Sequence, residues 1–151
     1  MAAEENKGII SHYREEVWNE GVLDAVDRHI RPDYVRHDPG LPEDVGGPEA
    51  VKQLVGMYRA AFPDLHVTAE DMISEGDKVV QRLTSRRTHQ GELTGTPATG
   101  RQITVTGIEI FRLAEGRMAE QWIALDNLGL LQQLGVIPSK GEAGERLVPI
   151  H

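Results

Sequence analysis

The chain has 151 residues, 39% of them hydrophobic and 26% charged, and its formal net charge at pH 7 is −8. This length suits one domain, and the acidic balance argues against nucleic-acid binding, because phosphate recognition relies on clustered Lys and Arg. The sequence has no cysteine, no apolar run near the roughly 20 residues of a membrane helix and no signal-peptide pattern at its start, so we expect a cytoplasmic location without disulfides.

The first half of the chain predicts three helices. Apolar residues between Ile10 and Trp18 recur at helical spacing and predict the first of them. A short second helix is expected before Pro32, and a third begins at Pro48, because proline is well tolerated in the first helical turn. Between these two helices, residues 33–47 predict a brief strand followed by a loop rich in Gly and Pro.

The second half predicts antiparallel strands, because β-compatible segments alternate with turn signals. These segments are residues 65–69, 78–89, 101–113 and 117–125, with turns at 75–77 and 115–116. The strand at 104–111 has apolar residues in both alternating phases, which is typical of a strand covered on both faces. The helices would cover one face, and a partner subunit or a bound apolar ligand would cover the other.

Helices followed by a curved antiparallel sheet indicate the α+β class. We expect a cone-shaped sheet closed by the three N-terminal helices, with a pocket inside. The predicted domain spans residues 1–138. Residues 139–151 are rich in Gly and charge, and we expect them to form a loose tail or to cross to a partner subunit.

Seven short blocks in order along the chain resemble the SnoaL-like polyketide cyclase family of the nuclear-transport-factor-like superfamily. They are YREEVWNEG at 13–21, AFPDL at 61–65, EGDKVV at 75–80, THQG at 88–91, TGR at 99–101, GIEIFR at 107–112 and LLQQLG at 130–135. Each block alone is weakly specific, but the ordered set is fairly specific and extends over about residues 8–138.

The resemblance implies a cone fold, a homodimer or homotetramer, and closure of polyketide rings by intramolecular aldol chemistry without metal or cofactor. The apolar, polyketide-like substrate would occupy the pocket. Two positions depart from the family pattern. Ile123 follows Trp122 where the cyclases carry their acid–base residue, and Ala98 stands where a second proline is usual. An isoleucine moves no proton, so an aldol reaction in this chain would need another acid–base group.

Three residues are candidates for proton transfer: Asp126, His37 and Asp38. Asp126 lies three positions beyond Ile123, but the sequence after it also predicts that it caps a closing helix. His37 and Asp38 end the short strand beside the Gly/Pro loop, where side chains reach the mouth of a cavity. His37 suits proton transfer near neutral pH, whereas Asp38 is equally well explained as a residue that shapes the turn.

A further set of residues is expected to line the pocket or bind substrate, although residues of these kinds also serve as ordinary core. His89 lies on the same side of its predicted strand as Leu83, which places it on the inner face. Glu109 is either paired with an arginine or available for acid–base work. The set is Trp122, His89, Tyr58, Met57, Tyr13, Glu109 and Ile123. We expect no metal, because the six histidines are scattered and none forms a close His-x-x-x-His pair.

Two alternatives to aldol ring closure stay open. The first is different chemistry in the same pocket, such as hydration, epoxide opening, hydroxylation or a pericyclic closure. Epoxide opening generally uses two carboxylates around a water molecule, so it would place Asp38 and Asp126, or Glu109, on the cavity wall. The second alternative is a module that binds an apolar small molecule without turnover.

Overall fold

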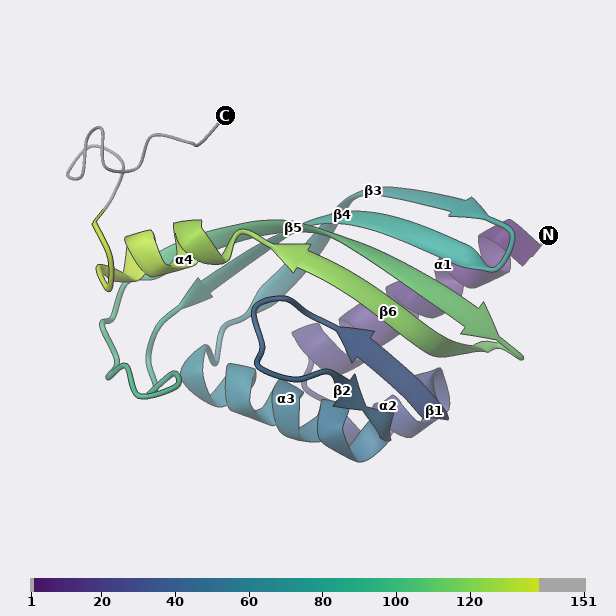
Figure 1. Cartoon of the computed structure of the whole chain (residues 1–151), viewed down its shortest axis with the longest axis horizontal. Coiled ribbons are helices and arrows are strands. Elements are labelled where there is room, and N and C mark those ends of the chain that lie inside the picture. Colours follow the sequence, from purple (N-terminus) through teal and green to yellow (C-terminus); the bar gives the residue numbers. More distant parts are fainter. Residues whose placement is uncertain (1, 139–151) are drawn as a thin grey trace.

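The six strands of this protein form one curved sheet, in the order β2-β1-β6-β5-β4-β3 (Figure 1). The structure is a computed structural model that describes residues 2–138. The strands are β1 (Ile30–His37), β2 (Val45–Gly46), β3 (His66–Glu75), β4 (Lys78–Thr88), β5 (Gln102–Ala114) and β6 (Arg117–Leu125). Strand β1 pairs with β6 in parallel, and the other pairs are antiparallel.

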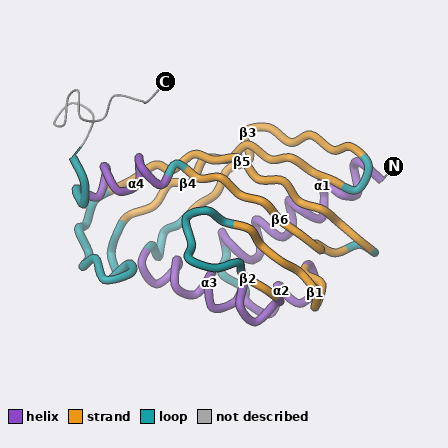
Figure 2. Tube along the Cα trace, in the orientation of Figure 1, coloured by secondary structure: helices purple, strands orange, loops and turns teal. Residues whose placement is uncertain are grey.

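The N-terminal helices lie together on one face of this sheet, as Figure 2 shows by secondary structure. They are α1 (Ala2–Tyr13), α2 (Val26–His29) and α3 (Gly47–Ala61); α4 (Asn127–Leu134) follows β6. The predicted α+β class and the N-terminal helical layer are confirmed. The first helix differs from the prediction at its end, where Arg14–Asn19 winds as a π-helix. Such wider turns often occur at functional sites, and this one carries two cavity-lining residues, Arg14 and Trp18.

The core consists of two apolar clusters between the helices and the sheet. One joins α1 to the inner face of the sheet through residues such as Ile10, Tyr13 and Phe111. The other joins the end of α3 to β5, through residues such as Phe62 and Val105. Side chains of both clusters line the same cavity, so the packing that holds the helices on the sheet also shapes the site.

On the opposite face of β5, the described residues leave Ile108 largely uncovered. Val105 and Phe111 are buried, as their phase predicts, but Ile108 in the other phase is 52% exposed. The predicted cover for that face, a partner subunit or a ligand, therefore stays a prediction. The predicted tail, residues 139–151, lies outside the described residues. Within the described part of the chain, no helix combines the length and the apolar character that a membrane crossing requires.

Candidate functional site

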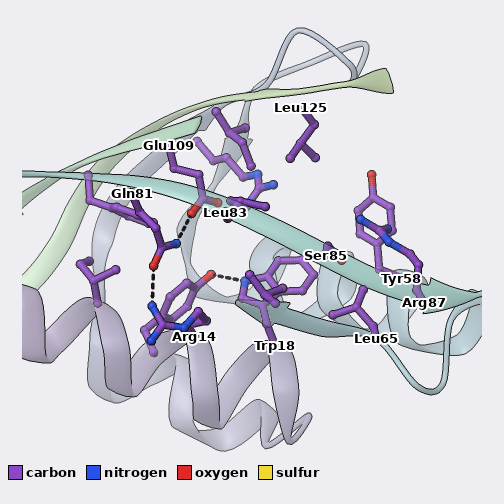
Figure 3. Close-up of a pocket in the computed structure, with 16 residues that line it drawn as sticks. Arg14, Trp18, Tyr58, Leu65, Gln81, Leu83, Ser85, Arg87, Glu109 and Leu125 are labelled. Carbon is purple, nitrogen blue, oxygen red and sulfur yellow. Dashed lines mark hydrogen bonds between the residues drawn. The ribbon is translucent and has the colours of Figure 1, made fainter. Parts of the chain in front are cut away.

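A largely apolar cavity lies between the inner face of the sheet and the helices (Figure 3). The cavity and its mouth enclose about 560 Å³ free of atoms. Because side chains alternate along a strand, one face of β4 contributes four wall residues in a row, at positions 81, 83, 85 and 87. The lining residues are Ile10, Tyr13, Arg14, Trp18, Arg36, Tyr58, Leu65, Val67, Gln81, Leu83, Ser85, Arg87, Glu109, Phe111, Ile123 and Leu125.

Glu109 is a buried carboxylate at one end of this cavity, with 8% of its surface exposed. The side-chain amide of Gln81 donates a 2.7 Å hydrogen bond to Oε2 of Glu109, and that of Gln121 donates a 3.1 Å bond to Oε1. Arg14 donates to the carbonyl of the Gln81 side chain, and the Tyr34 hydroxyl donates to that of Gln121. The chain of donors fixes which way both amides point, so each presents its NH₂ group to the carboxylate.

Burial raises the pKa of Glu109, and the cation of Arg36 and the amide of Gln81 oppose that rise. Arg36 is 3% exposed, and its Nη2 lies 3.7 Å from Oδ2 of Asp38. Its Nε and Nη1 have no hydrogen-bond partner among the described residues. The site therefore combines a carboxylate whose proton affinity is raised with a fixed cation that favours negative charge nearby. This pairing suits proton abstraction followed by stabilisation of an oxyanion.

The other polar end of the cavity contains Arg87 and Ser85. Arg87 is 7% exposed, and its guanidinium lies over the Phe62 ring, 4.7 Å from the centroid, and 5.9 Å from that of Tyr58. Burial lowers the pKa of Arg87 to about 10, against a smaller opposing effect of Tyr58, so the group stays protonated at neutral pH. The Ser85 hydroxyl is buried and has no hydrogen-bond partner among the described residues.

Four of the sequence-predicted site residues line this cavity: Tyr13, Tyr58, Glu109 and Ile123. Two others do not, although both were expected to. Met57 is half-buried on α3 outside the lining. His89 follows β4 and is fully buried, with its ring 5.6 Å from that of Phe62 and its Nδ1 3.1 Å from Oγ1 of Thr99.

Three more predicted residues, His37, Asp38 and Trp122, gather in a second and more open groove, which also touches Ile123. His37 stacks on Trp122 with the ring centroids 5.6 Å apart. Its Nε2 lies 2.7 Å from Oε2 of Glu120. Asp38 is buried, and its Oδ1 accepts a 2.8 Å hydrogen bond from the backbone N–H of Gly40, which is the turn-shaping geometry.

Asp126 lies at the start of α4, on the surface. Its Oδ1 accepts a 2.9 Å hydrogen bond from the backbone N–H of Gly129, which is a helix N-cap. Asp126 lines neither the cavity nor the groove. The structure therefore separates the predicted proton-transfer residues from the cavity and places Glu109 in it.

Sequence reasoning missed most of the polar cavity residues: Arg14, Arg36, Gln81, Ser85 and Arg87. A signal for three of them is that they lie on the same face of β4 as the core residues Val79 and Leu83. The polar residues on that face are at positions 81, 85 and 87. Polar side chains on a core-facing phase indicate a wall that meets a polar ligand or a buried network. Among residues 2–138, no three His, Cys, Asp or Glu side chains gather as metal ligands would.

Comparison with known proteins gives one consistent result. The family described as SnoaL-like polyketide cyclase matches residues 10–134. Nogalonic acid methyl ester cyclase of Streptomyces nogalater is 35% identical over 121 residues, which cover 78% of this chain and 89% of that protein. Aklanonic acid methyl ester cyclase DnrD of Streptomyces peucetius is 32% identical over 124 residues, covering 80% and 84%. The structure of TsrD from Streptomyces laurentii superimposes with a TM-score of 0.79 at 31% identity, covering 89% and 97%.

Proposed function

This chain belongs to the SnoaL-like polyketide cyclase family, and from that premise we propose that it closes a ring of a polyketide ester by an intramolecular aldol reaction, with Glu109 as the acid–base residue. The observation that carries the proposal is a single one. Glu109 is a buried carboxylate in an apolar cavity, and burial raises its pKa toward the range in which a group both takes up and releases a proton.

In the proposed reaction, a Glu109 oxygen takes a proton from a substrate carbon next to a carbonyl group. The resulting enolate carbon attacks a ketone carbon elsewhere in the same molecule, and a C–C bond forms while the C=O π electrons move to oxygen. That oxygen takes the proton back from Glu109 and becomes a hydroxyl group. Substrate and product are isomers of equal mass, so the cycle consumes no co-reactant and needs no cofactor.

Arg36 would stabilise the negative charge that moves from the enolate to the acceptor oxygen. It is a buried cation on the wall that Glu109 shares, and two of its nitrogens, Nε and Nη1, have no hydrogen-bond partner within the described residues. Fixed donors aimed at developing charge supply a large part of catalysis in dry sites. The apolar walls around Tyr13, Trp18 and Phe111 would hold the chain of the substrate folded for attack.

The earlier candidates for proton transfer have weaker support. Asp126 uses one oxygen to cap α4 at the surface, and His37 and Asp38 lie in the outer groove. Among the described residues, Glu109 is the only acidic side chain on the inner cavity wall. Epoxide opening by two carboxylates around one water molecule is therefore disfavoured. A homo-oligomer and a cytoplasmic location remain part of the proposal.

The test uses aklanonic acid methyl ester, the compound in the name of one relative. Its turnover is measured with the wild type and with Glu109→Gln. We expect a product of unchanged mass that has lost one ketone signal in its carbon NMR spectrum. Glu109→Gln should lower kcat by roughly 10²–10⁴-fold, the usual contribution of general acid–base catalysis. Glu70→Gln, on the exposed surface of β3, is the matched control and should turn over normally.

Full activity of Glu109→Gln would remove Glu109 from the mechanism. Tight binding of the ester without turnover by the wild type would instead favour the binding-module alternative, which has one structural feature in its favour. Ile123, at the position where the resemblance places an acid, forms part of the apolar cavity wall.

A further inference from the structure

Arg87 is a buried cation that has no anionic partner within the described part of the chain. It is 7% exposed, yet it forms no ion pair with any carboxylate among residues 2–138, and its Nε lacks a hydrogen-bond acceptor. The other buried arginine, Arg36, lies near Asp38. A charge removed from water without a partner is costly, so this arrangement needs a reason.

The surroundings of Arg87 hold the guanidinium in place without neutralising it. Its guanidinium lies over the ring of Phe62, and the Tyr58 ring is also within cation–π distance. A cation–π contact uses no hydrogen-bond acceptor, and Nε of Arg87 has no hydrogen-bond partner among the described residues. Ser85, two residues earlier on the same face of β4, adds a buried hydroxyl that also has no partner among the described residues. Two unsatisfied polar groups therefore lie at one end of one cavity.

This end is separate from the Glu109 end, as Figure 3 shows, with Arg87, Tyr58 and Leu65 to one side and Gln81 with Glu109 to the other. Positions 81 and 87 are six residues apart on β4, so their backbones are about 20 Å apart at roughly 3.3 Å per residue. The wall between them includes Leu83 and, across the sheet, Leu125. The cavity thus has an acid–base end, an apolar middle and a cationic end.

We propose that Arg87, assisted by Ser85, binds an anionic oxygen of the substrate at the cavity end away from Glu109. The inference rests on the proposed function, because it takes the same cavity as the substrate site. The ligand would be an elongated, mainly apolar molecule with a carboxylate or an ionised phenol or enol at one end. Arg87 is then a substrate-positioning residue that sets which carbon lies beside Glu109.

The test measures binding rather than turnover, so its outcome does not depend on whether Glu109 is catalytic. Three fluorescent or absorbing probes of similar size are titrated: 2-naphthoate, the ionised phenol 2,4-dinitro-1-naphtholate, and neutral methyl 2-naphthoate. Wild type should bind at least one anion about ten- to hundredfold more tightly than the ester, the strength of a hydrogen bond to a charged group. The two anions distinguish a carboxylate from a phenolate ligand.

Arg87→Met should abolish this preference, and Arg87→Lys should restore part of it. The matched control is Arg86→Met, the neighbouring arginine on the opposite, exposed face of β4, which should keep the preference. Without ligand, Arg87→Met should also raise the melting temperature by about 2–4 °C, because it removes an unpaired buried charge. Equal binding of anion and ester by wild type, or an unchanged preference in Arg87→Met, would overturn the proposal.

Discussion

Gln81 and Glu109 are directly opposite each other in the β4–β5 ladder, and the Gln81 amide donates a 2.7 Å hydrogen bond to the Glu109 carboxylate. Both side chains point to the inner face of the sheet. Arg14, on the π-helical turn, donates to the carbonyl oxygen of the same Gln81 side chain. Gln81 therefore connects the helical layer to the carboxylate, and its amide orientation is fixed by Arg14.

This relationship predicts a pH effect of Gln81→Leu. The Gln81 hydrogen bond lowers the pKa of Glu109, in opposition to burial, so its loss should raise that pKa further. If ionised Glu109 is the base, the rate falls as pH drops through its pKa. The acidic limb of the kcat–pH profile should then move to higher pH in Gln81→Leu.

The comparison is with Leu83→Met, a volume-conserving change at the next wall position of β4, which should leave the limb in place. If Gln81→Leu lowers the maximal kcat but leaves the acidic limb of the kcat–pH profile at the same pH, Gln81 supports the packing of the site and does not set the pKa of Glu109.

Tyr34→Phe should destabilise the protein without removing any cavity-lining group. The Tyr34 hydroxyl is buried and donates to Gln121, whose amide in turn donates to Glu109. Loss of the hydroxyl leaves the Gln121 carbonyl oxygen unsatisfied, which costs about 1–3 kcal/mol. Urea unfolding should show a lower midpoint with an unchanged m-value. A loss below about 0.5 kcal/mol would mean that the Gln121 oxygen finds another donor.

The order of helices and strands could be predicted because each signal is local. The spacing of apolar residues from Ile10 to Trp18, proline at 48 and the turn at 115–116 act within a few residues of chain. The winding of Arg14–Asn19 as a π-helix could not, because it depends on contacts with distant strands, such as that of Asn19 with the backbone of Val67.

The site was harder to predict than the fold, because it is assembled across strands. Glu109 lies on the same side of β5 as core residues of that strand, and this side faces the cavity. Its role, however, depends on Gln81 and Gln121, which lie 28 and 12 residues away along the chain. Asp126 shows the reverse case, since its capping pattern was local and is present in the structure.

Asp126→Ala should lower the free energy of unfolding by about 1 kcal/mol, the usual value of a helix N-cap. Asp126→Asn keeps an oxygen that accepts from Gly129, so it should be nearly as stable as wild type. Both variants should retain turnover, because Asp126 is exposed and outside the cavity lining. A stable Asp126→Asn that has lost its activity would return Asp126 to the mechanism.

His37 should make the stability of the protein fall as pH rises above the unfolded-state pKa of histidine, about 6.5. Its hydrogen bonds to Glu120 and then to Asp44 raise the pKa of His37 in the folded state, against the effect of burial. Arg112 also lies 3.3 Å from Glu120 and competes for the same carboxylate. A raised folded-state pKa means that the stabilisation is fully present below the unfolded value of about 6.5.

That stabilisation is lost as pH rises through the raised pKa, because the folded protein then gives up the proton that it had held more tightly than the unfolded chain. Urea unfolding of wild type between pH 5.5 and 9 should therefore show a falling midpoint, and His37→Asn should flatten that part of the curve. The imidazole is one-third exposed, with a side-chain exposure of 33%, so added salt should weaken the effect. An identical slope in His37→Asn would assign the titration to another group and leave the His37–Glu120 contact without a stabilising role.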